Sequence, residues 1–274
     1  MWPTPMPHHN HDLLTVLLRH GNRSVPSSQQ TWLWFFDFDG TLVDLAPHPD
    51  AVKLLPDLTD DLIRLATAPL QTVAIVSGRP LRDLTRHLPS HPALWLAGDH
   101  GAEVRGPQSF VWRHPSQETI EDEANTVALD LHTRVKDLPG VWVEAKATSM
   151  SIHYRQAPQA AIVNLNRILR EYCWGSTWVL KPGQLCYEVR ATNGPTKADA
   201  VRVIRGTVDP QGTSLCLAWG DDVTDEDMFL ALPTGLTVKV GTDAAFPTSA
   251  RFRVESVATV REIIHQMARY WTQS

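Results

Sequence analysis

Asp37 and Asp39 stand two residues apart in the segment WLWFFDFDGTLVD, directly after an apolar run and directly before Gly-Thr. Side chains alternate between the two sides of a strand, so we expect both carboxylates to lean to one side and Phe38 to the other. Carboxylates this close repel each other and raise each other's pKa unless a cation lies between them. The pair therefore predicts either a bound metal ion or a carboxyl group that keeps its proton.

A second acidic segment, GDDVTDED at 220–227, has a possible structural role at the start of a helix. Thr224 would cap the helix with Asp227 three residues further on. Asp225 and Glu226 would lie near the positive end of the helix dipole, where acids are stabilised. This interpretation accounts for Glu226 and Asp227.

The first two acids of that segment, Asp221 and Asp222, need another explanation because they follow the buried run LCLAW. The carboxyl ends of buried parallel strands meet at one edge of a sheet, where ligands bind. Two more acids beside the first pair would be strongly unfavourable without a hard cation. Oxygen ligands of this kind suit Mg²⁺, which takes a few carboxylates and keeps water or phosphate in its other positions.

Lys197 and Ser77 would supply the groups that a phosphate needs. Lys197 stands in the first turn of a predicted helix, where the dipole disfavours a cation. It is either a solvated surface lysine or a partner for a phosphate and for the Asp37 carboxylate. Ser77 opens the segment SGRP and could serve as a helix N-cap, as part of an anion site, or as both. Together with Mg²⁺ and an anionic nucleophile, these groups predict phosphoryl transfer.

Buried strands alternate with helices around these groups, which predicts a parallel sheet covered on both faces. Strands are expected at 32–36, 72–76, 94–103 (ending in a loop), 214–220 and 236–240, and helices at 13–21, 58–69, 79–88, 196–206 and 225–232. From about residue 106 the alternation has a period of two, in SMSIHYR at 149–155 and QLCYEVR at 184–190, with a helix at 157–172 between them. Such strands indicate a small antiparallel α+β unit with one polar face.

These patterns predict an α/β protein whose core is interrupted by an inserted domain. We expect an N-terminal extension at 1–30, a core domain at 31–106 and 193–274, and a cap domain at 107–192.

The composition narrows the class of protein. The net charge of −5 over 274 residues argues against a nucleic-acid partner. Three scattered cysteines, Cys173, Cys186 and Cys216, indicate reduced structural thiols. No apolar run reaches the ~18 residues of a membrane span, and the first residues lack the pattern of a signal peptide. We expect a cytoplasmic monomer that acts on a small molecule and binds neither nucleic acid nor membrane.

The motifs DFDGT, SGR, the isolated Lys197 and GDDVTDED resemble, in this order, the four motifs of the haloacid dehalogenase (HAD) superfamily. More narrowly, PHPDAV, GDHGAE, EAKATSMSIHYRQAPQ and GDDVTDEDMF are similar to strings of the bacterial-type trehalose-6-phosphate phosphatases. The resemblance runs from about Leu33 to the C-terminus, and the cap strings are more specific than the core motifs. It implies a Rossmann-like HAD core with a C2-type cap. It also implies Mg²⁺-dependent hydrolysis of trehalose 6-phosphate to trehalose and phosphate, a step of trehalose biosynthesis.

The resemblance implies a role for each matching residue. Asp37 would be the nucleophile that forms an aspartyl-phosphate, and Asp39 would protonate the leaving sugar oxygen and then deprotonate water. Ser77 and Lys197 would hold the phosphate. The implied Mg²⁺ ligands are Asp37, the carbonyl of Asp39 and Asp221, with Asp222 or Asp225 helping directly or through water. The implied substrate-binding residues are Gly78, His100, Gly101, Glu103, Glu144, Lys146, Arg155 and Glu188.

Three positions depart from the family pattern. Gln184 stands where the family usually has lysine, Ala198 where it usually has glycine, and Ala145 where many relatives have aspartate. None of these departures removes a catalytic group.

Two alternatives stay open. A phosphatase for another sugar phosphate, such as sucrose phosphate or a glucosyl- or mannosyl-glycerol derivative, would keep the core and change the cap residues. A non-catalytic sugar-phosphate sensor should have lost Asp37, Asp39 or Lys197, all of which are present.

Overall fold

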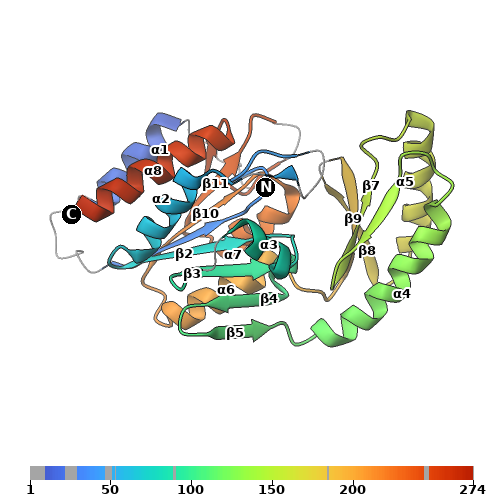
Figure 1. The fold of residues 1–274 in the computed structure, drawn as a ribbon, viewed down its shortest axis with the longest axis horizontal. Helices are drawn as coiled ribbons and strands as arrows, with labels where there is room; N and C mark the ends of the chain where they lie inside the picture. Colours follow the sequence, from blue (N-terminus) through green and yellow to red (C-terminus); the bar gives the residue numbers. More distant parts are fainter. Residues whose placement is uncertain are drawn as a thin grey trace, which may run out of the picture. The chain divides into compact units, whose positions relative to one another are not determined.

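The computed structural model describes residues 10–21, 30–46, 51–52, 54–88, 91–183, 185–243 and 247–273. The chain divides into two compact units, one made of Met1–Trp112 with Lys197–Ser274 and the other of Arg113–Thr196. Figure 1 shows the helices and strands of both. No helix among the described residues has the length and apolar character needed to cross a membrane.

The first unit is built on an eight-stranded sheet with the order β12-β11-β10-β1-β2-β3-β4-β5. Its strands are β1 (Trp32–Phe36), β2 (Gln71–Val76), β3 (Leu94–Gly98), β4 (Glu103–Gly106), β5 (Phe110–Arg113), β10 (Leu215–Gly220), β11 (Leu236–Val240) and β12 (Phe252–Val254). The strands from β12 to β3 are parallel, and β4 pairs antiparallel with β3. The expected cap boundary at residue 107 falls in the turn between β4 and β5 of this sheet.

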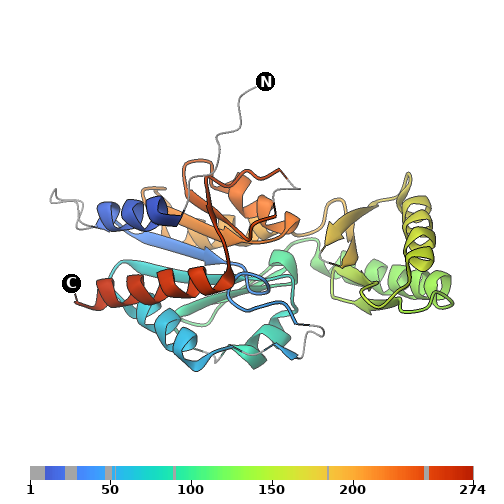
Figure 2. The same cartoon turned by 90° about the horizontal axis from the view of Figure 1, so that it is seen from above.

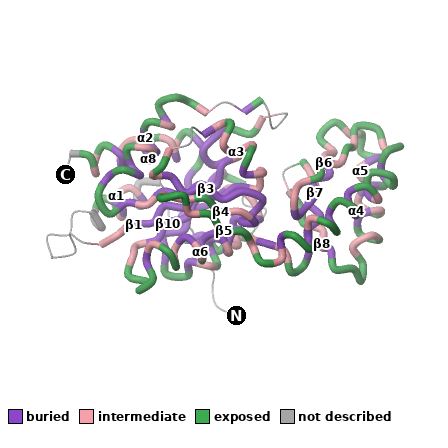
Figure 3. The backbone as a smooth tube through the Cα atoms, turned by 60° about the horizontal axis from the view of Figure 1, so that its bottom comes forward, coloured by how far each residue is buried: buried purple, intermediate pink, exposed green. Residues whose placement is uncertain are grey.

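Helices cover both faces of this sheet, which explains why all five residues of WLWFF are buried. Trp32, Trp34 and Phe36 face a cluster formed with α1 (Asn10–Gly21), α2 (Pro56–Thr67), α3 (Leu81–His87) and α8 (Val257–Gln273). Leu33 and Phe35 face a second cluster with α6 (Lys197–Val208) and α7 (Glu226–Ala231). Helix α8 runs beside α2 (Figures 1 and 2). The central strands are coloured as buried in Figure 3.

Helix α1 lies within the segment that we expected to be an extension. Its Leu13 and Leu17 are fully buried in the first cluster. Part of this N-terminal segment therefore contributes to the core of the first unit.

The second unit contains a four-stranded antiparallel sheet with the order β6-β7-β9-β8 and two helices. Its elements are α4 (Gln117–Val135), β6 (Trp142–Ala145), β7 (Ser149–His153), α5 (Gln159–Cys173), β8 (Trp178–Gly183) and β9 (Cys186–Ala191). Met150 lies opposite Val189, and Ser151 lies opposite Glu188, so the register matches the alternation of apolar and polar residues. Sequence patterns did not predict α4, β6 or β8.

Candidate active site

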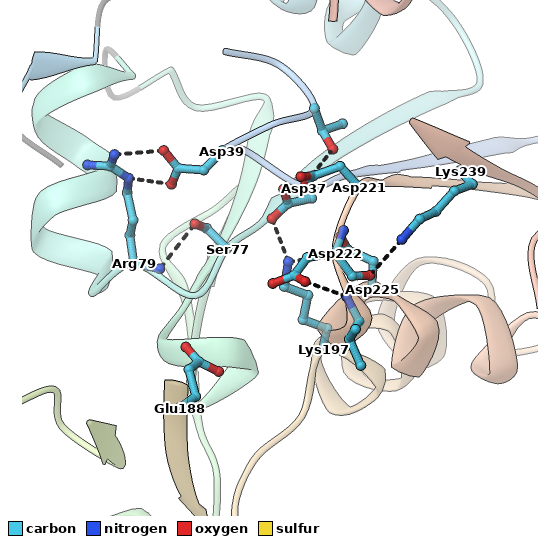
Figure 4. Close-up of polar contacts among 12 residues, drawn as sticks. Asp37, Asp39, Ser77, Arg79, Glu188, Lys197, Asp221, Asp222, Asp225 and Lys239 are labelled. Atoms are coloured by element: carbon cyan, nitrogen blue, oxygen red, sulfur yellow. Dashed lines mark hydrogen bonds and ion pairs between the residues drawn. The ribbon is translucent and has the colours of Figure 1, made fainter. Parts of the chain in front are cut away.

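Polar side chains gather where the central strands of the first unit end, as Figure 4 shows. Asp37 follows β1, Ser77 follows β2 and Asp221 follows β10, while Lys197 is the first residue of α6. The backbone N–H of Asp37 donates to the carbonyl of Trp219 at 2.9 Å, which continues the pairing of β1 with β10 by one residue. The parallel sheet thus brings together four groups that are far apart in sequence.

Lys197 is a buried ion-pair partner of two carboxylates, so the interpretation as a solvated surface lysine is wrong. Its side chain is 3% exposed, and Nζ donates to Oδ1 of Asp37 at 2.5 Å and to Oδ1 of Asp225 at 2.6 Å. Burial opposes the charge of Lys197, but the carboxylates of Asp225 and Asp37 outweigh it and raise the pKa of the ammonium group. Lys197 therefore carries a positive charge at the centre of this site.

Asp37, Asp221 and Asp225 form an acidic cluster in which one carboxylate oxygen of each lies within 4.8 Å of the others. The pKa of Asp37 is raised from 3.8 to about 7, chiefly by burial and also by the charges of Asp225 and Asp39, and these causes outweigh the lowering by Lys197. Burial and the neighbouring Asp37 also raise the pKa of Asp221. Raised pKa values mark negative charge that lacks compensation, and a divalent cation would supply it. An all-oxygen set of three carboxylates is a suitable metal site.

Asp222 has a structural role that the sequence interpretation gave to other residues. Its Oδ1 accepts from the N–H of Val223 at 2.7 Å, and Oδ2 of Asp225 accepts from the N–H of Asp222 at 2.9 Å. This reciprocal capping box closes the 3₁₀ turn at Val223–Asp225. The predicted cap of Thr224 with Asp227 is therefore wrong, because the turn begins two residues earlier than expected. Of the two residues left open as a further metal ligand, the geometry brings Asp225 into the acidic cluster.

Asp39 lies outside the acidic cluster, although its charge is among the causes that raise the pKa of Asp37, as the close spacing of the two acids predicted. Strand β1 ends at Phe36, so the alternation of side chains no longer applies at Asp39. Both oxygens of its carboxylate accept from Arg79, from Nε at 2.6 Å and from Nη2 at 2.7 Å. Figure 4 shows Asp39 turned toward Arg79 and Asp37 turned toward Lys197. In the contacts that the structure describes, Lys197 pairs with Asp37 and Arg79 pairs with Asp39.

Ser77 and the GDHG segment fold against each other. Oγ of Ser77 accepts from the N–H of Arg79 at 3.1 Å, and α3 has no side-chain cap at its first turn. The N–H of His100 donates to the carbonyl of Ser77 at 3.0 Å. A Cβ on Gly78 would overlap the His100 ring, so this glycine permits the close approach. The structure thus brings together the predicted residues Ser77, Gly78 and His100.

The backbone of the GDHG segment is strained. Asp99, His100 and Gly101 have φ values of 47°, 55° and 97°, a run of three residues in the left-handed region. Such conformations are unfavourable for residues with a Cβ and are concentrated at functional sites. Glu103, two residues further on in β4, pairs with Arg105 at 3.0 Å.

The substrate residues predicted in the second unit lie on and beside the polar face of its sheet. Nζ of Lys146 lies 3.3 Å from Oε1 of Glu188, and both side chains are largely buried. Oε2 of Glu144 lies 2.8 Å from Nε2 of His153. Arg155 is exposed in a turn beyond the end of β7, so the alternation of that strand does not assign it to the polar face.

The three departures from the family pattern are distributed over both units. Ala145 is exposed at the end of β6, and Ala198 is buried in the first turn of α6. Gln184 lies outside the described residues.

Sequence reasoning assigned no role to Arg79 or to Lys239. Nζ of Lys239 donates to the carbonyl of Asp222 at 3.2 Å, and the residue is buried. The sequence contained a signal for Lys239, because a lysine inside the buried run LTVKV needs a hydrogen-bond or ion-pair partner. Arg79 gave no such signal, because the sequence does not show which acid a loop arginine meets.

The chain is similar to known phosphatases over most of its length. The sequence model of the trehalose-phosphatase family matches residues 35–258. The trehalose-6-phosphate phosphatase of Escherichia coli (strain K12) is 33% identical over 240 residues, 86% of each chain. The probable trehalose-phosphate phosphatase of Sinorhizobium fredii (strain NBRC 101917 / NGR234) is 34% identical over 249 residues, 89% of this chain and 91% of the relative. The C-terminal domain of C. albicans trehalose-6-phosphate phosphatase has a similar fold, with a TM-score of 0.81, 22% identity, and coverage of 96% and 99%.

A parallel α/β core with an inserted antiparallel unit gives the chain a HAD-like fold. Within that class, the chain belongs to the trehalose-phosphatase family. These comparisons confirm the predicted fold class, the predicted family and the predicted class of enzyme, a phosphoric monoester hydrolase.

Proposed function

We propose that this chain hydrolyses trehalose 6-phosphate to trehalose and phosphate, with Asp37 as nucleophile and Mg²⁺ as cofactor. One observation carries the proposal: Lys197 joins Asp37 to Asp225 inside the segment that matches the trehalose-phosphatase family. The substrate follows from the names of the relatives and from the polar residues of the second unit. We also propose a cytoplasmic location, which the free cysteines of the described residues support.

The acidic cluster and the carbonyl of Asp39 would hold the metal ion. When bound, Mg²⁺ would neutralise charge on the cluster and on the phosphoryl oxygens. It would also lower the pKa of Asp37, which burial holds at about 7, and so keep the nucleophile ionised.

The chain's own residues would carry the two chemical steps. An oxygen of Asp37 forms a bond to phosphorus while the bond from phosphorus to the sugar oxygen breaks, and Asp39 gives that oxygen a proton. Asp39 then takes a proton from a water molecule, whose oxygen attacks phosphorus and releases Asp37. Lys197 and Ser77 would hold the phosphoryl group during both steps, with Gly78, His100, Gly101 and Glu103 beside them.

The second unit would supply the sugar contacts. Glu144, Lys146 and Glu188 lie in a polar set whose members already hydrogen-bond or pair with one another or with a neighbour. Carboxylates and an ammonium group held in this way are suitable partners for sugar hydroxyls. We include Arg155 in the proposed set, as the resemblance implies.

The test is release of phosphate from a panel of sugar phosphates, with Mg²⁺ and with EDTA. We expect trehalose 6-phosphate to be hydrolysed at least tenfold faster than the others, and both EDTA and Asp37→Asn to abolish release. Asp221→Asn should also abolish it, whereas Asp222→Ser keeps a capping oxygen and should retain most of the activity.

The other outcomes of that panel separate the parts of the proposal. Preference for another sugar phosphate would leave the chemistry in place and overturn the substrate. Binding of trehalose 6-phosphate without hydrolysis would favour the sensor. Equal loss in the Asp221 and Asp222 variants would contradict the assignment of the metal site.

A further inference from the structure

One guanidinium group holds the Asp39 carboxylate at both of its oxygens. Nε and Nη2 of Arg79 donate to Oδ2 and Oδ1 at 2.6 and 2.7 Å. Two parallel bonds from a planar fork fix the rotation of a carboxylate as well as its position, which the point charge of a lysine does not do. The direction in which Asp39 faces is therefore set by Arg79.

Arg79 is itself held in place by its neighbours. Its guanidinium lies over the Phe38 ring, 5.4 Å from the ring centroid, and Nη1 is 3.3 Å from Nε2 of His87. Its backbone N–H donates to Oγ of Ser77, and its carbonyl accepts from the N–H of Asp99 at 2.8 Å. The side chain is 10% exposed. Arg79 is thus a prearranged link between the Ser77 segment and Asp39.

The fork keeps Asp39 apart from the acidic cluster. That cluster gathers Asp37 and two further acids around Lys197, whereas Asp39 is turned toward α3 (Figure 4).

We propose that Arg79 is the positioning residue of Asp39: its two bonds hold that carboxylate in the orientation it needs for proton transfer. Both bonds are made to the carboxylate form, so the role concerns the second proton transfer, in which Asp39 accepts a proton from the attacking water. The inference rests on the proposed function, because that function gives Asp39 its two proton transfers.

A double-mutant cycle tests this role. Arg79→Met, Asp39→Asn and the double variant are compared with the natural protein in kcat and KM for trehalose 6-phosphate. Acid–base catalysis contributes about 10²–10⁴-fold, so we expect Arg79→Met alone to lower kcat roughly 10- to 100-fold, with KM changed by less than about threefold. In the Asp39→Asn background the same change should have no further effect, because the two residues act as one unit.

A second substrate separates the two chemical steps. The p-nitrophenolate of p-nitrophenyl phosphate leaves without a proton, so Arg79→Met should keep the initial burst of p-nitrophenolate and slow the steady rate that follows. Arg82→Met is the matched control. Arg82 lies three residues after Arg79, in the first turn of α3, with its side chain 80% exposed and a partner at 3.7 Å, and the variant should leave kcat, KM and the burst unchanged.

Three results would overturn the role of Arg79: an equal loss in the Asp39→Asn background, a rise in KM with kcat unchanged, or no loss of kcat. If Arg79→Met does not fold, Arg79→Lys keeps the charge without the fork and should give the same pattern in the cycle. If the natural protein prefers another sugar phosphate, the proposed substrate is wrong, and the double-mutant cycle is then measured with the preferred sugar phosphate. If no phosphate ester is hydrolysed, both proposals fail.

Discussion

Replacing Lys197 by methionine should destabilise the first unit strongly, and more so at high pH. The ammonium group lies 2.5 and 2.6 Å from two carboxylates whose side chains are 6% and 0% exposed. Methionine fills a similar volume but leaves Asp37 and Asp225 buried without their cation. Breaking a buried ion pair by removing one partner costs about 3–5 kcal/mol. We expect a loss of this size at pH 8.

The loss should be smaller at pH 6, because the carboxyl group can take up a proton. The pKa of Asp37 is already about 7 beside Lys197, and it should rise further without the lysine. A carboxyl whose pKa is raised in the folded state binds a proton there that the unfolded chain does not hold. Its stability contribution is therefore greatest at low pH and is lost as the pH rises toward the folded-state pKa. Mg²⁺ should restore part of the stability at pH 8 by replacing the missing charge.

The measurement is urea-induced unfolding at pH 6 and pH 8, with and without Mg²⁺. The two units can unfold separately, so the transition of the first unit is followed by hydrogen exchange of β1 and β10 amides. Arg202→Met, at an exposed position of the same helix, is the control and should change the stability of the first unit by less than about 0.5 kcal/mol. A loss for Lys197→Met below about 1 kcal/mol at pH 8, or equal losses at both pH values, would refute the reasoning.

Three further predictions concern the metal site and the second unit. Gly40 has a φ of +83°, and a Cβ at this position would overlap the Asp221 carboxylate. The variant Gly40→Ala should therefore bind Mg²⁺ at least tenfold more weakly, as measured by calorimetry. Unchanged binding would contradict the proposed ligand set. With the pKa of Asp37 at about 7, Mg²⁺ displaces a proton, so its affinity should rise roughly tenfold between pH 6 and pH 8. Calorimetry in two buffers counts that proton, and a flat affinity would refute the linkage. Glu188→Gln should leave a partner of Lys146 uncharged and raise KM for trehalose 6-phosphate, with little effect on p-nitrophenyl phosphate; equal effects on both substrates would exclude a sugar contact.

The core of the first unit was predictable because its strands are buried on both faces. Such strands read as continuous apolar runs, as WLWFF and LCLAW do, and their order with the helices indicates a parallel sheet. The same pattern located Asp37, Ser77, Lys197 and Asp221, because each stands at a strand end or at the start of a helix. Position in the chain was sufficient for these four.

Helix α4 was missed although its signal is present in the sequence. Ile120, Ala124, Val127, Leu131 and Val135 are spaced three or four residues apart and are buried. The apolar stripe is narrow and the rest of the segment is rich in acids. The helical periodicity of apolar residues is therefore weak in this segment. The structure shows that this stripe covers the apolar face of the second unit's sheet.

The pairing of acids with cations could not be predicted in the same way. Alternation along a strand says where side chains point only as far as the strand continues, and β1 ends at Phe36. Beyond that residue the turn sets the direction of Asp39, and a guanidinium from another loop fixes it. Contacts between loops depend on tertiary structure, which one sequence does not encode as a local pattern.

The charges of the site explain why its acids are distributed in this way. The acidic cluster carries three carboxylates when ionised, and Lys197 supplies one positive charge, which leaves two negative charges for a divalent cation to balance. If Asp39 joined the cluster, a third negative charge would remain and the metal would gain a ligand that the proposed chemistry needs elsewhere. Arg79 neutralises the charge of Asp39 in a separate ion pair, so this charge does not add to that of the acidic cluster. The two cations therefore divide the acids into a set that is suited to a metal ion and a single acid to which the proposed function gives the proton transfers.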